Sequence, residues 1–106
     1  MITIEQFQGV ELRVATVLAA EPHPNADRLL VLRVDVGGAE RQIVAGIRAA
    51  YDPATLVGRQ IVVVANLQPA TLRGVESQGM LLAAAGADGP VVLVPERPVP
   101  AGAVVR

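Results

Sequence analysis

Apolar and polar residues alternate along two stretches near the start of the chain, 10–20 and 28–36. Side chains two residues apart lie on the same face of a β-strand, so this alternation predicts two strands, each with one buried face. The faces that we expect to point inward are Leu12, Val14, Thr16 and Leu18 in the first strand and Leu30, Leu32, Val34 and Val36 in the second. The prolines between them predict a loop over residues 21–25.

The second and third strands are expected to form a hairpin. Gly37-Gly38 follows the second strand, and paired glycines supply the positive backbone dihedrals of a tight turn. Residues 41–45 then run back as the third strand. A connector over residues 46–58 contains a short helix, because Asp52 can cap it, Pro53 suits its first position and Gly58 can end it.

The second half of the chain continues with apolar strands. Residues 60–66 are nearly all apolar, and strands are predicted again over 79–86 and 91–94, on either side of a turn at 87–90. At the N-terminus Thr3 and Gln6 have the spacing of a capping box. We therefore expect a short helix there, with Ile4 and Phe7 closing one end of the core.

Five or more short strands, tight turns and one helix suit a small closed barrel better than an open sheet, because closure removes exposed strand edges. We predict an all-β fold: a five-stranded OB-fold Greek-key barrel with a short interposed helix and terminal extensions, occupying residues 1–106 as one domain. Sandwiches and other barrels are the alternatives on pattern alone.

Composition narrows the chemistry. The chain is 52% hydrophobic but 2% aromatic, so the core must be aliphatic, and it has no cysteine for disulfides, thiolate metal sites or nucleophiles. No apolar run approaches the ~18 residues of a membrane span. The N-terminal residues lack a basic region and an apolar signal core, which favours a cytoplasmic protein without membrane contact.

The charged residues exclude a strongly basic surface. Nine basic and ten acidic residues give a net charge of −1, and every basic residue is arginine. Arginine makes planar, bidentate contacts with phosphates, where lysine offers only a point charge. An anion-binding site in this chain must therefore depend on a few well-placed arginines.

The sequence offers little for catalysis, and we expect no catalytic residue, no metal and no cofactor. His23 is the one histidine and lies between two prolines, as expected of a solvated loop residue. One histidine without cysteine cannot supply the usual zinc ligands. Ser77 has no G-x-S-x-G context, and no glycine-rich phosphate loop is present.

Stacking on aromatic side chains is also poorly supported. Phe7 and Tyr51 are the only aromatic residues. We expect Phe7 in the core, and Tyr51 is as able to pack as to stack. Any nucleic-acid ligand would therefore be recognised by shape and backbone contact, as is common for folded RNA.

Five motifs are spread over residues 23–84. They are HPNADRL (23–29), VDVGG (34–38), IVAGI (43–47), Y-x-P-x-x-L-x-G (51–58) and ANLQPATLRGVESQGMLLAA (65–84). On these motifs the chain resembles the tRNA-binding domain family over residues 8–105. The resemblance implies the barrel fold, no catalytic activity, and a homodimer that holds tRNA by its shape, either free-standing or with an aminoacyl-tRNA synthetase.

The resemblance also implies a binding surface. Matched to the family motif, the tRNA-contacting residues are Asn66, Arg73, Ser77 and Met80. Alternation along the second and third strands adds Arg33 and Arg41, which we expect on the outer face. Each has a structural alternative: Asn66 could satisfy a strand end, Met80 could fill the core, and the two arginines could simply be solvated.

The chain departs from the family pattern beside the implied surface. Gln68 and Thr71 stand where relatives commonly have lysine, and Ala45 replaces a common serine. With ~5 phosphate contacts, counterion release would lower the affinity about 500-fold between 50 and 200 mM salt. Without these lysines we expect tRNA binding that is weaker and more salt-sensitive than in lysine-bearing relatives.

Two other functions remain open. A chaperone-like relative of the same domain would bind polypeptides, which the nearly neutral charge favours and the intact RGxxSxGM signature of residues 73–80 opposes. A dimerisation module of a larger synthetase is the other. For a dimer, the apolar residues 98–106, residues 1–10 and parts of 46–58 are the expected contact, since such surfaces are seldom left in water.

Overall fold

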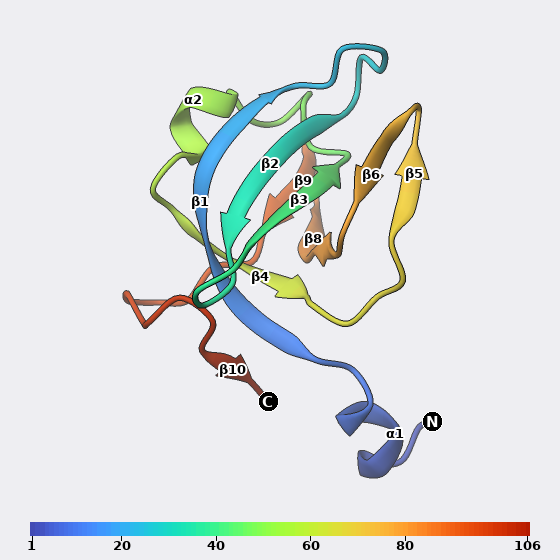
Figure 1. Cartoon of the computed structure of the whole chain (residues 1–106), viewed down its shortest axis with the longest axis vertical. Coiled ribbons are helices and arrows are strands. Elements are labelled where there is room, and N and C mark those ends of the chain that lie inside the picture. The colour runs from blue at the N-terminus through green and yellow to red at the C-terminus, as the bar shows by residue number, and fades with distance from the viewer.

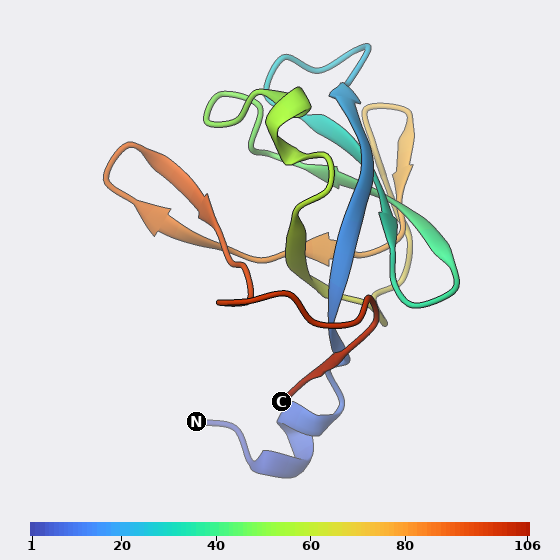
Figure 2. The same ribbon diagram turned by 90° about the vertical axis from the view of Figure 1, so that its left-hand side faces the viewer.

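The computed structural model describes residues 1–106 as a curved, nearly closed barrel (Figures 1 and 2). Neighbouring strands follow the order β3-β2-β1-β4-β7, and every pair is antiparallel. The barrel strands are β1 (Leu12–Pro22), β2 (Leu30–Asp35), β3 (Glu40–Ala45), β4 (Gln60–Val64) and β7 (Met80–Leu81). This order, with a short helix between β3 and β4, is the OB-fold Greek key, so the predicted fold is confirmed.

Backbone and side-chain amides link β3 to the segment before β7 and bring the two ends of the sheet together. Gln78 N donates to Gln42 O at 2.7 Å, and Gln42 N donates to Gln78 Oε1 at 3.0 Å. The side chain of Gln42 also donates to Glu76 O at 2.8 Å. Two glutamines thus supply part of the closure that a regular strand ladder would provide.

Further elements lie outside this barrel sheet. They are α1 (Ile4–Gln8), α2 (Pro53–Leu56), β5 (Ala70–Leu72), β6 (Val75–Ser77), β8 (Ala83–Gly86), β9 (Gly89–Val92) and β10 (Val104–Val105). Strands β5–β6 and β8–β9 each form their own two-stranded hairpin, while β10 pairs with the start of β1. No helix is long and apolar enough to cross a membrane.

The core is aliphatic, as the composition predicts. Its 13 buried members are Ala15, Val17, Leu30, Leu32, Val34, Ile43, Ala45, Ile47, Leu56, Ile61, Val63, Leu81 and Val92. Tyr51 packs against this cluster, and its hydroxyl accepts a hydrogen bond from Val92 N at 2.9 Å. Of the two roles open to Tyr51, the structure therefore shows packing.

The inward face expected for the first strand is wrong. Ala15 and Val17 point into the core, whereas Leu18 is 43% exposed. A bulge between Val17 and Ala19 shifts the register with β2, and the C-terminal segment lies along β1, with Gly102 N donating to Val14 O at 2.7 Å. Because β1 is covered on more than one side, alternation does not reveal its core face. The inward face predicted for the second strand is confirmed.

The N-terminal helix forms but does not close the core. Thr3 and Gln6 make the predicted capping box. Ile4 and Phe7 are 63% and 37% exposed, contrary to expectation, because α1 lies below the barrel and no residue of it is buried (Figures 1 and 2). Its apolar side chains line a groove with Val105 instead.

The predicted hairpin and connector are confirmed, whereas the last strands differ. The turn lies at Gly37-Gly38, and Asp52 caps α2 with Pro53 at its start. The strand expected over 79–86 is divided at Leu82, since the chain there leaves the barrel to form the β8–β9 hairpin. That hairpin has a two-residue turn between Gly86 and Gly89, so β9 begins earlier than predicted.

Candidate nucleic-acid interface

The β5–β6 hairpin carries Arg73 at its tip. Leu72 and Val75 are paired, so Arg73 and Gly74 are the two central residues of the turn, with φ of 52° and 89°. Positive φ at both positions is typical of a type I′ turn, where Asn-Gly is usual. Arg73 is the only non-glycine residue with positive φ, a conformation that costs about 1 kcal/mol or more. Such strain at an exposed tip indicates a functional reason for arginine.

Ser77 lies inside the protein, with 4% of its surface exposed. Its hydroxyl accepts from Val44 N and donates to Gly79 O, both at 2.9 Å. Gly79 is required because a Cβ there would lie 2.8 Å from Val64 O. The serine therefore anchors the root of the hairpin to β3, and a hydrogen bond donated to a ligand would have to replace the one to Gly79 O. Its tRNA contact stays a prediction.

Asn66 is exposed and ties the N-terminal arm to the end of β4. Its Oδ1 accepts from Glu11 N at 2.9 Å and its Nδ2 donates to Gly9 O at 2.8 Å. Both ends of the amide are thus used within the chain, in agreement with the structural alternative for this residue. The same side chain also lines a polar groove beside the arm.

This polar groove, of about 430 Å³, contains two of the predicted residues. It is lined by Glu40, Arg41, Ala65, Asn66, Leu67, Gln68, Pro69 and Gln78. Arg41 was expected on the outer face, but it pairs with the inward-facing Val34, and paired residues share a face. It lies at the end of the barrel because β3 begins there, and its guanidinium donates to Ala65 O.

Arg33 and Met80 are exposed on other parts of the surface. Arg33 faces outward as predicted and its Nε lies 3.7 Å from Glu40 Oε2, an exposed ion pair worth roughly 1 kcal/mol or less. Met80 is 48% exposed, so it is not core filler. It lines an apolar groove of about 350 Å³ together with Val44, Ile47 and Leu81.

The structure therefore brings the predicted residues together only in part. Arg41 and Asn66 share the polar groove, while Ser77 and Met80 lie on either side of Gly79. Arg73 stands four residues along the hairpin from Ser77, roughly 13 Å away at about 3.3 Å per extended residue. The candidate interface is a broad surface around the hairpin, and not a single pocket.

Sequence reasoning missed His23. The expectation of a solvated loop residue is wrong, since His23 is 2% exposed. Its Nδ1 accepts from Asn25 N and its Nε2 contacts Leu72 O, both at 2.9 Å. Since an accepting Nδ1 carries no proton, Nε2 must be the donor to Leu72. No local signal predicted this burial, because the partner Leu72 lies 49 residues further along the chain.

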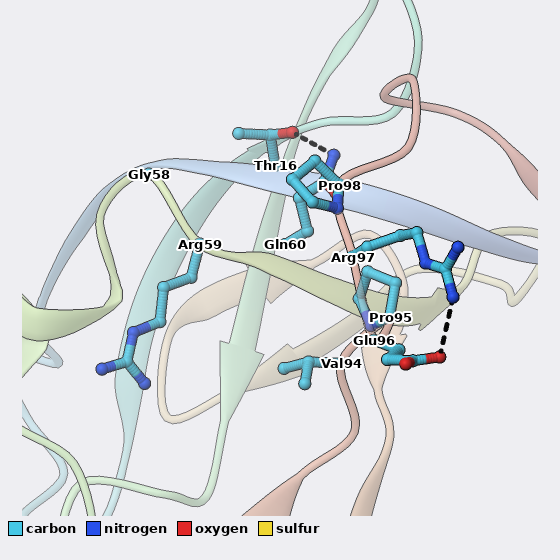
Figure 3. Close-up of a pocket in the computed structure, with 9 residues that line it drawn as sticks. All are labelled: Thr16, Gly58, Arg59, Gln60, Val94, Pro95, Glu96, Arg97 and Pro98. Atoms are coloured by element: carbon cyan, nitrogen blue, oxygen red, sulfur yellow. Dashed lines mark hydrogen bonds and ion pairs between the residues drawn. The ribbon is translucent and has the colours of Figure 1, made fainter.

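A groove of about 500 Å³ lies away from the predicted residues, where Thr16 and β4 meet residues 94–98 (Figure 3). There Arg97 Nη2 lies 3.3 Å from Glu96 Oε2. The guanidinium of Arg59 points away from this pair and makes no hydrogen bond or ion pair. No group of three or more acidic or histidine side chains is arranged to hold a metal.

An OB barrel of this topology, with arginines and amides displayed around one hairpin, defines a small ligand-binding module. The family model described as "Putative tRNA binding domain" matches residues 12–104. The chain belongs to this family of tRNA-binding domains.

The methionine–tRNA ligases that the chain matches are much longer than this chain. It is 54% identical over 106 residues to the methionine–tRNA ligase of Methanothrix thermoacetophila, covering 100% of the chain and 16% of the relative. It is 47% identical over 105 residues to that of Pyrococcus furiosus, covering 99% of the chain and 14% of the relative. The chain thus spans about one-seventh of the length of such relatives and corresponds to one module of them.

Two solved structures resemble the whole chain. A MetRS related protein from Pyrococcus horikoshii superposes with a TM-score of 0.93 and 36% identity, covering 100% of this chain and 98% of that one. The chaperone CsaA of Bacillus anthracis superposes with a TM-score of 0.90 and 32% identity, covering 100% and 99%. The tRNA-binding domain and the chaperone-like domain, the two alternatives raised from the sequence, therefore share one fold.

Proposed function

We propose that the chain is a non-catalytic, cytoplasmic tRNA-binding module that grips tRNA as a homodimer, free-standing or with an aminoacyl-tRNA synthetase. The observation that carries this proposal is the family match over residues 12–104, with methionine–tRNA ligases similar over the full chain. Binding chemistry would come from Arg73, Met80, Arg33 and Arg41. Ser77 would support that surface from within, and Asn66 would support it by holding the N-terminal arm beside the polar groove.

Recognition would follow the shape and backbone of the RNA. The only tyrosine packs against the core, so the chain offers no row of aromatic side chains on which unpaired bases could stack. Arginine forks suit phosphate oxygens, and the serine and amides are already engaged within the fold. Folded tRNA should accordingly bind better than a single strand of the same length.

The N-terminal arm supports a homodimer. Ile2, Ile4 and Val104 are 67%, 63% and 54% exposed, and the apolar residues of α1 line a groove of about 430 Å³ with those of β10. Both termini lie together below the barrel (Figures 1 and 2). An exposed apolar surface of this kind is typical of a protein contact, and a second copy would cover it.

A filter-binding titration against purified tRNA tests the proposal, with an unstructured RNA of equal length and a tRNA unfolded by chelation of Mg²⁺ as competitors beside folded tRNA. We expect saturable binding that the folded competitor displaces best. Light scattering at micromolar concentration should give the mass of two chains. Equal competition by the unstructured RNA would refute shape selectivity, and the mass of one chain would refute the dimer.

Polypeptide binding is the second candidate, favoured by the likeness to the chaperone CsaA and by the apolar groove beside Met80. Such a groove could take apolar side chains of an extended peptide. Suppression of aggregation of an unfolded protein, abolished by Met80→Glu, would support this function. Retention of tRNA binding by the same variant would then separate the two activities.

A further inference from the structure

The motif HPNADRL, residues 23–29, forms a closed loop between β1 and β2. His23 N donates to Leu29 O at 3.0 Å and Leu29 N donates to Ala26 O at 3.4 Å, so the loop is held at both its base and its turn. The proposed tRNA-binding surface makes no use of this loop. The loop is nevertheless in contact with Arg73, which donates a hydrogen bond to it.

Three arginines belong to this loop or contact it. Arg28 belongs to it and is exposed. Arg48 donates through Nη1 to Ala26 O at 3.3 Å, and its backbone N donates to Arg28 O at 3.4 Å. Arg73 donates through Nη2 to Asn25 O at 3.3 Å. Two guanidinium groups are therefore held on the carbonyls of consecutive residues, whose Cα atoms are about 3.8 Å apart.

None of these three arginines has an acidic partner. The three ion pairs of the chain use Arg13, Arg33 and Arg97. Glu21 and Asp27 are the nearby acids of the loop in sequence, and neither lies within 4.0 Å of a guanidinium. Arginines that lack a paired carboxylate keep their donors and their charge available, so a bound anion would find them unneutralised.

His23 joins the loop to the hairpin that presents Arg73. It is buried, and its Nε2 donates to Leu72 O, the residue just before the strained turn. Both views of the molecule place the tip of β5–β6 beside the β1–β2 loop (Figures 1 and 2). The other bonds from the hairpin to the barrel involve Glu76, Ser77 and Gln78, toward its root. The histidine and Arg73 thus hold the tip.

We propose that the 23–29 loop, Arg48 and the tip of the β5–β6 hairpin form one phosphate-binding surface for the backbone of folded RNA. Arg28 and Arg48 contact phosphate together with Arg73, and His23 is a positioning residue that aligns the hairpin tip with the loop. The ligand follows from the chemistry, because guanidinium forks bind phosphate oxygens bidentately. This inference rests on the proposed tRNA-binding function and extends its surface.

The double variant Arg28→Gln, Arg48→Gln tests the proposed phosphate ligands, since glutamine removes the charge and keeps donors for the loop carbonyls. We expect weaker tRNA binding and a salt slope smaller by about one for each phosphate that the variant no longer neutralises. Arg59→Gln is the control, because Arg59 is exposed, belongs to the groove beside residues 94–98 and its side chain makes no hydrogen bond or ion pair. Asp27→Asn should act oppositely and strengthen binding.

Two substitutions of His23 separate its two hydrogen bonds. His23→Gln places a donor amide near the position of Nε2 and so keeps a link to Leu72 O. His23→Asn keeps an acceptor for Asn25 N near the position of Nδ1 and loses that link. We expect the asparagine variant to lose affinity as Arg73→Ala does, and the glutamine variant to retain most of it. Thermal unfolding of both variants confirms that they are folded.

A double-mutant cycle excludes a merely structural role. If His23 acts by placing Arg73, His23→Asn should have little further effect on tRNA affinity when Arg73→Ala is already present. Additive losses would overturn the positioning role. If wild type binds tRNA and the double-glutamine variant binds it as tightly as Arg59→Gln does, the phosphate surface is overturned and the proposed function stands. Absence of tRNA binding by wild type would overturn the proposed function, and this surface with it.

Discussion

The barrel and the β5–β6 hairpin are built on opposite principles. In the barrel, Leu30, Leu32 and Val34 on β2 are at most 1% exposed, and β2 pairs with a neighbour on each side. The hairpin pairs only with itself, its tip is exposed, and a few side-chain hydrogen bonds hold it to the barrel. Residues in the barrel are selected for packing, and those in the hairpin for what they present.

A substitution in the barrel should cost far more stability than one in the hairpin. Leu32→Ala removes a fully buried side chain and should lower the free energy of unfolding by about 2–5 kcal/mol, because it leaves a cavity. Leu72→Ala, at a residue 39% exposed, is the matched hairpin variant and should cost less than about 1.5 kcal/mol. Urea unfolding of both measures the difference. Equal losses would show that hairpin and barrel unfold as one packed unit.

Ser77 lies where the two regions join. Ser77→Ala leaves Val44 N and Gly79 O without their buried partner, so it should cost about 1–3 kcal/mol of stability. Ser77→Thr retains the hydroxyl, and so both hydrogen bonds, and serves as the control. Unfolding measured beside tRNA affinity tells whether the serine contacts RNA: weaker affinity with unchanged stability would contradict its role as an anchor.

Replacing Arg73 should make the protein more stable and its tRNA binding weaker. Arg73→Asn places a residue that tolerates positive φ in the turn, so the protein should become more stable by about 0.5–1 kcal/mol. The same change removes a charge from the tip and should weaken tRNA binding, with a shallower salt dependence. Thermal unfolding and filter binding are measured on one preparation. A variant that binds as well as wild type would remove the functional reason for the strain.

Restoring the missing cations should have the smallest effect. Gln68→Lys adds a charge to the polar groove beside Arg41, and Thr71→Lys adds one to the exposed hairpin. Each should raise tRNA affinity and steepen the salt slope by up to about 0.9 for each additional phosphate that is neutralised. Since the slope is proportional to the number of neutralised phosphates, the expectation that the present chain is more salt-sensitive than lysine-bearing relatives has the wrong sign. Arg59→Lys, which leaves the charge unchanged, serves as the control.

Local rules predicted the parts of the fold that depend on neighbouring residues. The capping box at Thr3, the cap at Asp52 and the turn at Gly37-Gly38 all formed as expected, because each is completed within a few residues. The inward face of β2 followed from alternation, since its outer face is more polar. The same rule failed for β1, because the C-terminal segment covers its other face and a bulge shifts its register with β2.

The candidate surface was less predictable than the barrel. The resemblance implied tRNA contacts at Arg73 and Met80; both side chains are exposed, at a turn and beside a groove, and their contact with RNA stays a prediction. It did not distinguish a serine that donates to a ligand from one that holds β3, or reveal that His23 is buried. Both outcomes depend on partners far along the chain, 33 residues away for Val44 and 49 for Leu72.

The sequence by itself therefore determined an aliphatic barrel, its two short helices, the β2–β3 hairpin and a resemblance to tRNA-binding domains, but not the β5–β6 hairpin. It did so because burial and turn formation depend on residue type and short spacing. Only the tertiary structure decided which polar side chains serve the fold and which face solvent. A polar group satisfies its hydrogen bonds with whatever the folded chain brings near it, and that neighbourhood does not exist until the barrel has closed.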